Sequence, residues 1–362
     1  MADKKAAMVG TPCQILAATK INEYKDKTGG SPICIKIGLF CMENFSYHYL
    51  KEFLENDGIK LKDVKEFRIE NNRFKVFLNS GDLKDYSIPQ TESFKRKNCD
   101  VCIDFASDFS DISVGSVGSK KGYSTLIVRS EKGEKIIEGL EKAGYIETTE
   151  VDEKLLNLLE KIAGGKKSKN LKNIEFKEKI ARQVLYNRII SEKEFEEDTD
   201  GADFDLLESD VIKVGNCVLC GACEYVCPEN IVEINSRKPV KKGKCRENCN
   251  LCYISCPRTF TSSKIISNDL KAKPESYPLG KYIKILNAKS TKNKGQDGGV
   301  VTAILLYLLD EKLVDDVFVV GEDPNNPWKP IPKLTSDKNE VLAAAGTKYS
   351  TVPIAFKALK TK

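Results

Sequence analysis

The sequence has little of what marks membrane, secreted or Rossmann-type proteins. Among its 362 residues, no apolar run approaches the roughly 18 residues of a membrane span, so no transmembrane helix is expected. The first residues lack the apolar segment of a signal peptide, and a cytoplasmic location is therefore expected. No G-x-G-x-x-G fingerprint occurs, so a Rossmann dinucleotide-binding fold is not supported.

Histidine, tryptophan and net charge are also scarce. The one histidine, His48, is expected on the surface of a helix, and the one tryptophan, Trp328, is expected to pack in a loop. The net charge is only +5, with 31% charged residues. This mildly basic balance is too weak to indicate nucleic-acid binding, and none is predicted. It would suit an anionic small-molecule substrate.

Cysteine is plentiful by contrast, with 13 in the chain. Disulfides are disfavoured in a chain that is not secreted, so clustered cysteines are expected to bind metal. Their spacing is far from random, and it organises the rest of the prediction.

Strand and helix signals alternate through residues 1–150 and again through 281–362, which predicts an α/β (α+β) fold. Residues 64–89 alternate in the manner of a β-meander. Residues 151–204 are rich in lysine and glutamate, and we expect a mostly helical tail or connector whose charged face is solvated. Residues 266–280 are polar, contain two prolines and are expected to form a linker.

Residues 205–265 hold eight of the cysteines in two ferredoxin-like motifs. C-x2-C-x2-C-x3-C-P begins at Cys217, and a second motif with a wider first gap begins at Cys245. In such motifs three thiolates of one loop bind one 4Fe-4S cluster, and the cysteine before the proline binds the other. The predicted ligand sets are Cys217, Cys220, Cys223 and Cys256 for one cluster, and Cys245, Cys249, Cys252 and Cys227 for the other. The alternative is a pair of zinc sites, which would favour two separated cysteine pairs per metal.

The other five cysteines lie in the first 102 residues. Cys13, Cys41, Cys99 and Cys102 each fall at a turn or strand end, and loops that bring such thiolates together could hold a third cluster. From spacing alone, Cys99 and Cys102 could equally be a redox pair or half of a zinc site, and Cys13 could be a nucleophile. Cys34 falls inside an apolar strand and is expected to be a small core residue.

Six motifs carry a resemblance to a known family. "VGTPCQ", "GLFCMENFSY", "CDVCIDF", "DISVGSVGSKKGYSTLIVRS", "GQDGGVVTAIL" and "AAAGTKYS" resemble the coenzyme F420 hydrogenase and dehydrogenase beta-subunit family. The similarity covers nearly the whole chain outside residues 152–204. Because a ferredoxin module is present, the chain more closely resembles the F420-oxidising subunit of F420 dehydrogenase and the N-terminal half of F420-dependent sulfite reductase.

The resemblance implies cofactors and the residues that hold them. Members of this family exchange hydride with the deazaflavin F420 and carry FAD beside a 4Fe-4S cluster, so three clusters are implied here. By resemblance, Cys13, Cys41, Cys99 and Cys102 would bind the cluster nearest the flavin. The FAD and F420 contacts would come from the glycine-containing loops and their neighbours, namely Gly10, Thr11, Met42, Glu43, Asn44, Gly115, Ser116, Lys120, Lys121, Gly295, Asp297, Gly298, Gly299, Gly346, Thr347 and Lys348. Without the resemblance, the glycine loops read as plain turns and the lysines as surface residues.

The parts stand in a rotated order relative to the family. The "GTPCQ" half comes first, as residues 1–150, and the "GQDGG" half comes last, as residues 281–362. The sequence is therefore expected to be circularly permuted, with the ferredoxin-like domain at 205–265 between the two halves of the flavin domain. The strand "AAMVG" should then pair with strands from the far end of the chain. A chain assembled from adjoining reading frames and a truncated tandem are the alternatives.

The predicted function is an F420-linked flavin iron–sulfur oxidoreductase of methanogenesis. Hydride would pass between F420 and FAD, single electrons would pass through the clusters, and no side chain would need to act as acid or base. Partner redox subunits or ferredoxin would exchange the electrons, and any contact with a membrane would be through a partner complex. A same-fold subunit with another donor or acceptor, such as one serving formate dehydrogenase, and a non-catalytic electron-transfer or scaffold subunit are the alternatives.

Overall fold

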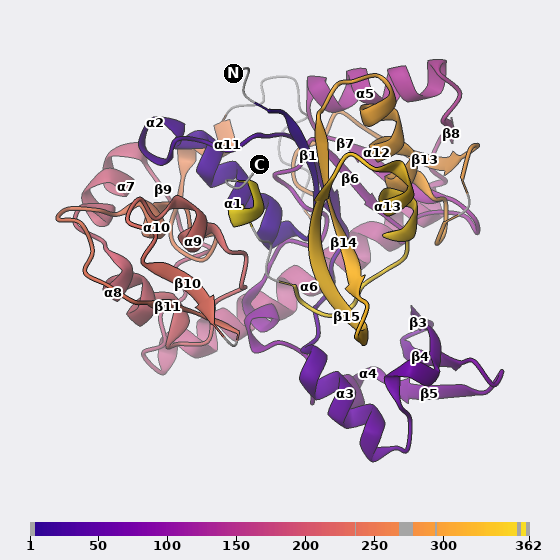
Figure 1. The fold of residues 1–362 in the computed structure, drawn as a ribbon, viewed down its shortest axis with the longest axis horizontal. Coiled ribbons are helices and arrows are strands. Elements are labelled where there is room, and N and C mark those ends of the chain that lie inside the picture. Colours follow the sequence, from indigo (N-terminus) through magenta and orange to yellow (C-terminus); the bar gives the residue numbers. More distant parts are fainter. Residues whose placement is uncertain (1–3, 236, 268–277, 294, 353–355, 360–362) are drawn as a thin grey trace.

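The computed structural model describes residues 4–235, 237–267, 278–293, 295–352 and 356–359. A large mixed sheet forms one lobe, the segment around residues 204–262 forms a second, and residues 47–91 project below the sheet (Figure 1). Most of the predicted linker, residues 268–277, lies outside the described residues. Each helix in the described part of the chain is too short or too polar to span a bilayer.

The large sheet joins the two ends of the chain. Its strand order is β15-β14-β1-β2-β6-β7-β13-β8. The strands are β1 (Ala6–Gly10), β2 (Ile33–Leu39), β6 (Ile112–Gly115), β7 (Ser124–Val128), β8 (Ile146–Thr149), β13 (Lys284–Ser290), β14 (Asp316–Asp323) and β15 (Asn326–Thr335). Strand β1 pairs in parallel with β14, with Ala6 opposite Asp316, and this confirms that "AAMVG" lies beside strands from the far end. The two halves close into one sheet, as the predicted permutation requires.

Helices cover both faces of this sheet. On one face, α5 (Glu131–Lys142) and α12 (Val300–Asp310) share an apolar core with Ala7 and Ile37. Helix α13 (Lys338–Ala343) adds Val341 to the same core. On the other face, α1 (Pro12–Glu23), followed by the short α2 (Lys25–Thr28), shares a core with Met8. Residues alternate between these cores along β1 because successive strand residues point to opposite faces.

The projecting lobe contains the predicted β-meander. Strands β3 (Val64–Glu70), β4 (Arg73–Leu78) and β5 (Leu83–Ser87) are antiparallel neighbours, and α3 (Tyr47–Asn56), η1 (Leu61–Asp63) and α4 (Ile88–Thr91) complete the lobe. Trp328 of β15 packs edge-on against Phe67, with ring centroids 4.7 Å apart, and its indole donates to the Val64 carbonyl. These contacts attach the lobe to the edge of the large sheet, and His48 is exposed on α3 as expected.

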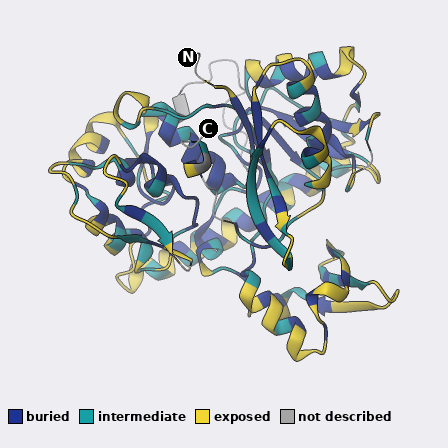
Figure 2. Cartoon of the chain, viewed as in Figure 1, coloured by how far each residue is buried: buried dark blue, intermediate teal, exposed yellow. Residues whose placement is uncertain are grey.

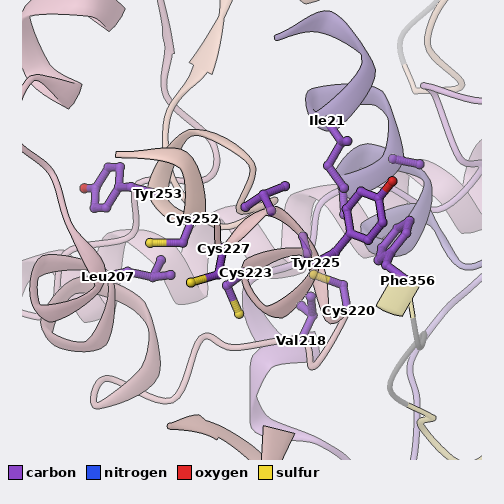
Figure 3. Close-up of a cluster of buried hydrophobic side chains, with 14 of the residues drawn as sticks. Ile21, Leu207, Val218, Cys220, Cys223, Tyr225, Cys227, Cys252, Tyr253 and Phe356 are labelled. Carbon is purple, nitrogen blue, oxygen red and sulfur yellow. The ribbon is translucent and has the colours of Figure 1, made fainter. Parts of the chain in front are cut away.

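The cysteine-rich segment folds into short elements against α1. They are α8 (Phe204–Leu207), a π-helical turn η3 (Glu208–Ile212), α9 (Ala222–Val226), the hairpin of β10 (Val232–Asn235) and β11 (Lys238–Lys241), α10 (Leu251–Ile254), β12 (Thr261–Ser262) and α11 (Ser263–Ser267). Strand β12 pairs with β9 (Ile189–Ile190), which precedes α7 (Glu192–Thr199). Ile21 of α1, Tyr225 of α9 and Phe356 of the turn η4 (Phe356–Leu359) meet in one buried cluster (Figure 3).

Helix α6 (Glu153–Lys179) confirms the helix predicted after residue 151, but the solvated-face interpretation is wrong for one side of it. The side chains at 159, 163, 166, 170 and 174 form a buried stripe. Leu159 and Ala163 pack against Phe105, and Ile174 packs against Val101, while the charged residues between them face outward (Figure 2). The helix is therefore part of the core rather than a free arm.

Candidate functional site

Four of the five cysteines outside the ferredoxin-like motifs line a single pocket. Cys13 lies in the first turn of α1, Cys41 follows β2, and Cys99 and Cys102 lie within and just after the 3-10 turn η2 (Lys97–Val101). This four-cysteine pocket has a free volume of about 30 Å³. The Thr11–Pro12 start of α1 aims the helix N-terminus toward the pocket wall.

Buried cations face these thiols. Burial raises the pKa of Cys41 well above its usual value and raises that of Cys99 to about 11, and the neighbouring thiols add to both shifts. Burial also opposes ionisation of Cys102, but the charges of Lys166 and Arg258 outweigh it and lower its pKa. Thiolates here would be stable only with a cationic partner, which is the situation that a bound metal cluster provides.

Arg258 supports this interpretation independently. It is 2% exposed, lines the four-cysteine pocket and donates from Nη2 to the Asn98 carbonyl at 3.1 Å. Its Nε and Nη1 are buried without a hydrogen-bond acceptor among the described groups. Because an unsatisfied buried donor is costly, these two groups point to an anionic acceptor in the pocket. The sulfur atoms of an iron–sulfur cluster are acceptors of this kind.

No three His, Cys, Asp or Glu side chains of the described residues are gathered tightly enough to hold a single metal ion. A cubane cluster asks for less, because its four thiolates bind four different irons around a larger body. The chemistry of the residues present, four thiols beside two buried cations, fits such a cluster.

The eight ferredoxin-type cysteines fall into the two predicted groups. The thiols that act electrostatically on Cys223 include Cys220, Cys217 and Cys256, and those that act on Cys252 include Cys249, Cys245 and Cys227. We call the first group (217, 220, 223, 256) the proximal set and the second (227, 245, 249, 252) the distal set. Figure 3 shows Cys220, Cys223, Cys227 and Cys252 side by side in the buried interior. Burial dominates the raised pKa of both Cys223 and Cys252.

The four-cysteine pocket adjoins the proximal set. Cys13 contributes to the raised pKa values of Cys217 and Cys220, whose main cause is burial. Arg96 donates to the Cys217 carbonyl at 3.0 Å, and the Arg258 amide donates to Cys256 Sγ at 3.4 Å. The three groups of cysteines therefore lie in series, with the proximal set in the middle.

Lys20 attaches the proximal set to α1. It is fully buried, and its ammonium donates to the carbonyls of Cys256 at 2.7 Å and Phe260 at 2.6 Å and to both the carbonyl and hydroxyl of Thr259. Burial lowers the pKa of Lys20 to about 7, against the opposing effect of nearby Cys256 and Cys220.

Lys20→Met is expected to destabilise the protein by about 3 kcal/mol, because it leaves several buried acceptors without a donor. Thermal unfolding of the anaerobic holoprotein, followed by circular dichroism, should show a midpoint lower by several degrees. The matched control is Lys27→Met, which removes the same charge from the exposed end of α2 and should leave the midpoint unchanged. Equal midpoints for the two variants would contradict the attachment role.

A second, larger cavity of about 680 Å³ lies between the large sheet and the projecting lobe. Its walls include Gly295 and Gln296 of the "GQDGG" loop, the Gly346–Lys348 loop and Arg68 of β3. The Thr347 amide donates to Gln296 Oε1 at 2.8 Å, so the two glycine loops are tied together. We call this the glycine-loop cavity, and its volume matches that of sites for drug-sized ligands and cofactors.

Close packing explains the glycines that open α12. A Cβ on Gly298 would lie 2.6 Å from the Ala288 carbonyl oxygen and 2.7 Å from the Ser124 amide nitrogen. Gly299 caps the helix at φ 65°, a left-handed conformation that favours glycine. Burial raises the pKa of the neighbouring Asp297, while Arg68 lowers it. The loop is therefore pressed against the sheet on one side and faces Arg68 on the other.

Segment 346–351 connects the two cavities. Gly346–Lys348 line the glycine-loop cavity, and Thr351 lines the four-cysteine pocket. Thr351 Oγ1 donates to Asn44 Oδ1 at 2.7 Å, and the Phe45 amide donates to the Tyr349 carbonyl at 2.9 Å. A ligand in the larger cavity would therefore lie near a cluster in the smaller one.

The predicted cofactor residues divide into three groups. Thr11, Met42, Glu43 and Asn44 line the four-cysteine pocket, and Gly295, Gly346, Thr347 and Lys348 line the glycine-loop cavity. The others line neither of these two cavities, namely Gly10, Gly115, Ser116, Lys120, Lys121, Asp297, Gly298 and Gly299.

The lysines of the first "GS" loop are at the surface. Lys120 and Lys121 are exposed after β6, and the Lys120 ammonium lies 4.1 Å from the centroid of the Tyr123 ring. Neither side chain lines a described cavity, so the structure gives no support to a phosphate contact from this pair. The predicted contact from Lys348 is better placed, because Lys348 lines the glycine-loop cavity, although it also pairs with Glu322 at 3.3 Å.

Three buried polar residues at the pocket were not predicted from the sequence. They are Lys166, Asn170 and Arg258, each 5% exposed or less. Lys166 and Asn170 are hidden among many lysines and asparagines of α6, and their only signal is a shared helical spacing with Leu159 and Ala163. Arg258 directly follows the Cys-Pro of the second motif, a place where the ferredoxin pattern itself predicts nothing.

Comparisons with known proteins identify two family regions. Residues 3–154 match the family model for the C terminus of the coenzyme F420 hydrogenase/dehydrogenase beta subunit, and residues 285–360 match the family model for its N-terminal part. The C-terminal region thus precedes the N-terminal region, which confirms the predicted permuted order.

Three curated relatives illustrate the similarity. The coenzyme F420 hydrogenase subunit beta of Methanococcus voltae is 38% identical over 186 residues, which cover 51% of this chain and 66% of the relative. The coenzyme F420-dependent sulfite reductase of Methanocaldococcus jannaschii is 32% identical and covers 52% and 30%. An F420H2 dehydrogenase subunit of Methanosarcina mazei is 33% identical and covers 36% and 37%. The chain therefore spans less than two thirds of the length of these relatives.

Proposed function

We propose that this chain, which belongs to the coenzyme F420 hydrogenase/dehydrogenase beta-subunit family, moves electrons between coenzyme F420 and one-electron acceptors through FAD and three 4Fe-4S clusters. The observation that carries the proposal is the serial arrangement of the three cysteine groups, with the four-cysteine pocket beside both the proximal set and the segment 346–351. A single-function binding protein would have no need for such a series.

The cysteines would hold the clusters as the sequence predicts. The proximal set and the distal set would each bind one ferredoxin-type cluster, and the four-cysteine pocket would bind the third. Arg258 would donate its two unpaired groups to the sulfur atoms of the third cluster, and its backbone already contacts Cys256 of the proximal set. Apolar side chains between the cysteines, such as Val218 and Ile254, are buried and would keep water away.

The glycine-loop cavity is the proposed site for FAD and F420. When bound, FAD supplies hydride exchange on one side and single-electron exchange on the other. The chain's own residues would bind and orient it: the glycine loops allow close approach of a cofactor, and Lys348 and Arg68 bring positive charge to an anionic ligand. Segment 346–351 would keep the flavin next to the four-cysteine pocket.

The remaining predictions belong to the same proposal. The domains would be a C-terminal-type half at 1–150, the connector at 151–204, the ferredoxin-like domain at 205–265, the linker at 266–280 and an N-terminal-type half at 281–362. Electrons would leave through a partner redox subunit or a ferredoxin, in the cytoplasm. The distal set would be the exit, because among the three groups it lies farthest along the series.

Cofactor analysis of the anaerobically reconstituted chain tests the proposal. We expect about 12 irons and one FAD per chain, together with oxidation of reduced F420 by a one-electron dye. Clusters without flavin would instead identify an electron-transfer or scaffold subunit. Full cofactors with dye reduction by dithionite but not by reduced F420 would identify a subunit with another donor.

A further inference from the structure

Helix α6 contacts three of the four cysteine-bearing positions of the four-cysteine pocket. Lys166 donates to the Cys41 carbonyl at 2.5 Å and to the Asp104 carbonyl at 2.7 Å. Asn170 donates to the Cys99 carbonyl at 2.9 Å and to the Cys102 carbonyl at 2.6 Å. One turn further on, Asn173 donates to the Asp100 carbonyl at 3.0 Å.

These donors belong to one face of α6. Lys166, Asn170 and Asn173 follow the spacing of four and then three residues that places side chains on one side of a helix. Lys166 and Asn170 are each 5% exposed, and apolar contacts at Leu159 and Ile174 fix the helix before and after them. The helix lies between the two regions that match the family models, which end at residue 154 and begin again at 285.

The charge of Lys166 faces the interior of the pocket. Its ammonium lines the four-cysteine pocket, and the groups that act on it electrostatically are Cys102, Cys41, Cys99 and the carboxylate of Asp104. Burying an ammonium is costly unless negative charge lies nearby. Thiolates that hold a cluster would supply that charge, and a cluster that gains an electron would gain more from it than one that has not.

We propose that Lys166 and Asn170 are positioning residues for the cluster in the four-cysteine pocket, and that Lys166 also raises its reduction potential. This inference rests on the proposed function, because it requires a cluster at that place. Asn170 fixes the loop between Cys99 and Cys102, and Lys166 fixes the loop after Cys41. Residues that orient metal ligands and place charge near a cluster set both its stability and its potential.

The test is a redox titration followed by electron paramagnetic resonance on the reconstituted full chain. Lys166→Met keeps the length of the side chain and removes its charge and donors, while Lys166→Arg keeps the charge. We expect Lys166→Met to shift the one-electron equilibrium of the flavin-side cluster toward the oxidised form by about tenfold, equivalent to about 59 mV. Lys166→Arg should lie nearer the wild type, and the two ferredoxin-type clusters should titrate unchanged.

Two further variants complete the test. Asn170→Asp is nearly isosteric but loses the donors to Cys99 and Cys102, and we expect it to lower the iron content toward about eight per chain by weakening the third cluster alone. Lys172→Met, on the exposed face of the same helix, is the matched control for charge. If Lys166→Met and Asn170→Asp match Lys172→Met in iron content and potential, the inference is wrong. If the wild type itself holds only two clusters, the proposed function fails instead.

Discussion

Cys41→Ala is expected to remove one cluster of three and to break the electron route at its first iron–sulfur step. Cys41 lines the four-cysteine pocket together with Cys13, Cys99 and Cys102, and three thiolates hold a 4Fe-4S cluster poorly. Iron should fall from about 12 to about 8 per chain. Reduced F420 should still reduce the flavin, but reduction of the ferredoxin-type clusters by F420 should fall to the background rate.

Iron analysis and electron paramagnetic resonance measure both effects on one sample. Cys34→Ala is the matched control, because Cys34 lies in β2, donates weakly to the Ala6 carbonyl and belongs to none of the three groups. It should retain all the iron and full cluster reduction. If Cys41→Ala also retains about 12 irons and normal reduction by F420, the third cluster lies elsewhere or does not exist.

Gly298→Ala is expected to have the largest effect of any substitution outside the cysteines. The new methyl group would lie within 2.7 Å of two backbone atoms, the Ala288 oxygen and the Ser124 nitrogen, in adjacent strands β13 and β7. Those atoms cannot move without disturbing the sheet, so the "GQDGG" loop must shift instead. Overpacking of this kind costs about 1–3 kcal/mol, and each 1.4 kcal/mol lost from binding weakens flavin affinity about tenfold.

Bound FAD, counted after gel filtration, and the thermal midpoint together check this prediction. We expect little retained flavin and a lower midpoint in Gly298→Ala, with the iron content unchanged. Gly165→Ala in α6 is the control, since a Cβ there meets nothing within 4 Å, and it should be neutral or stabilise by about 0.5–1 kcal/mol. Wild-type flavin content in Gly298→Ala would mean that the loop does not support the flavin.

The sequence was most informative where spacing alone dictates chemistry. The two ferredoxin-like motifs predicted the proximal and distal groups, because a short cysteine spacing fixes which thiols can meet. The predicted pairing of "AAMVG" with a strand from the far end was also confirmed, since β1 lies against β14. That prediction followed from the rotated order of motifs, which the comparisons share.

The sequence was least informative where a residue acts through its place in the fold. The lysine-rich α6 resembles a solvated helix in composition, yet a stripe beginning at Leu159 packs against the cysteine loops and buries Lys166. A charge pattern cannot distinguish one buried lysine from its exposed neighbours. The opposite error concerns Lys120 and Lys121, which stand in a glycine-containing loop but are exposed and line neither cavity.

Anaerobic titration of the reconstituted wild-type chain with reduced F420 tests the central claim most directly. Absorbance follows the flavin, and electron paramagnetic resonance of frozen samples follows the clusters. The account predicts that the flavin bleaches first and that signals from reduced clusters then grow until all three are accounted for. If FAD and about 12 irons are present but reduced F420 changes neither signal while dithionite reduces both, the claim that F420 is the donor is contradicted.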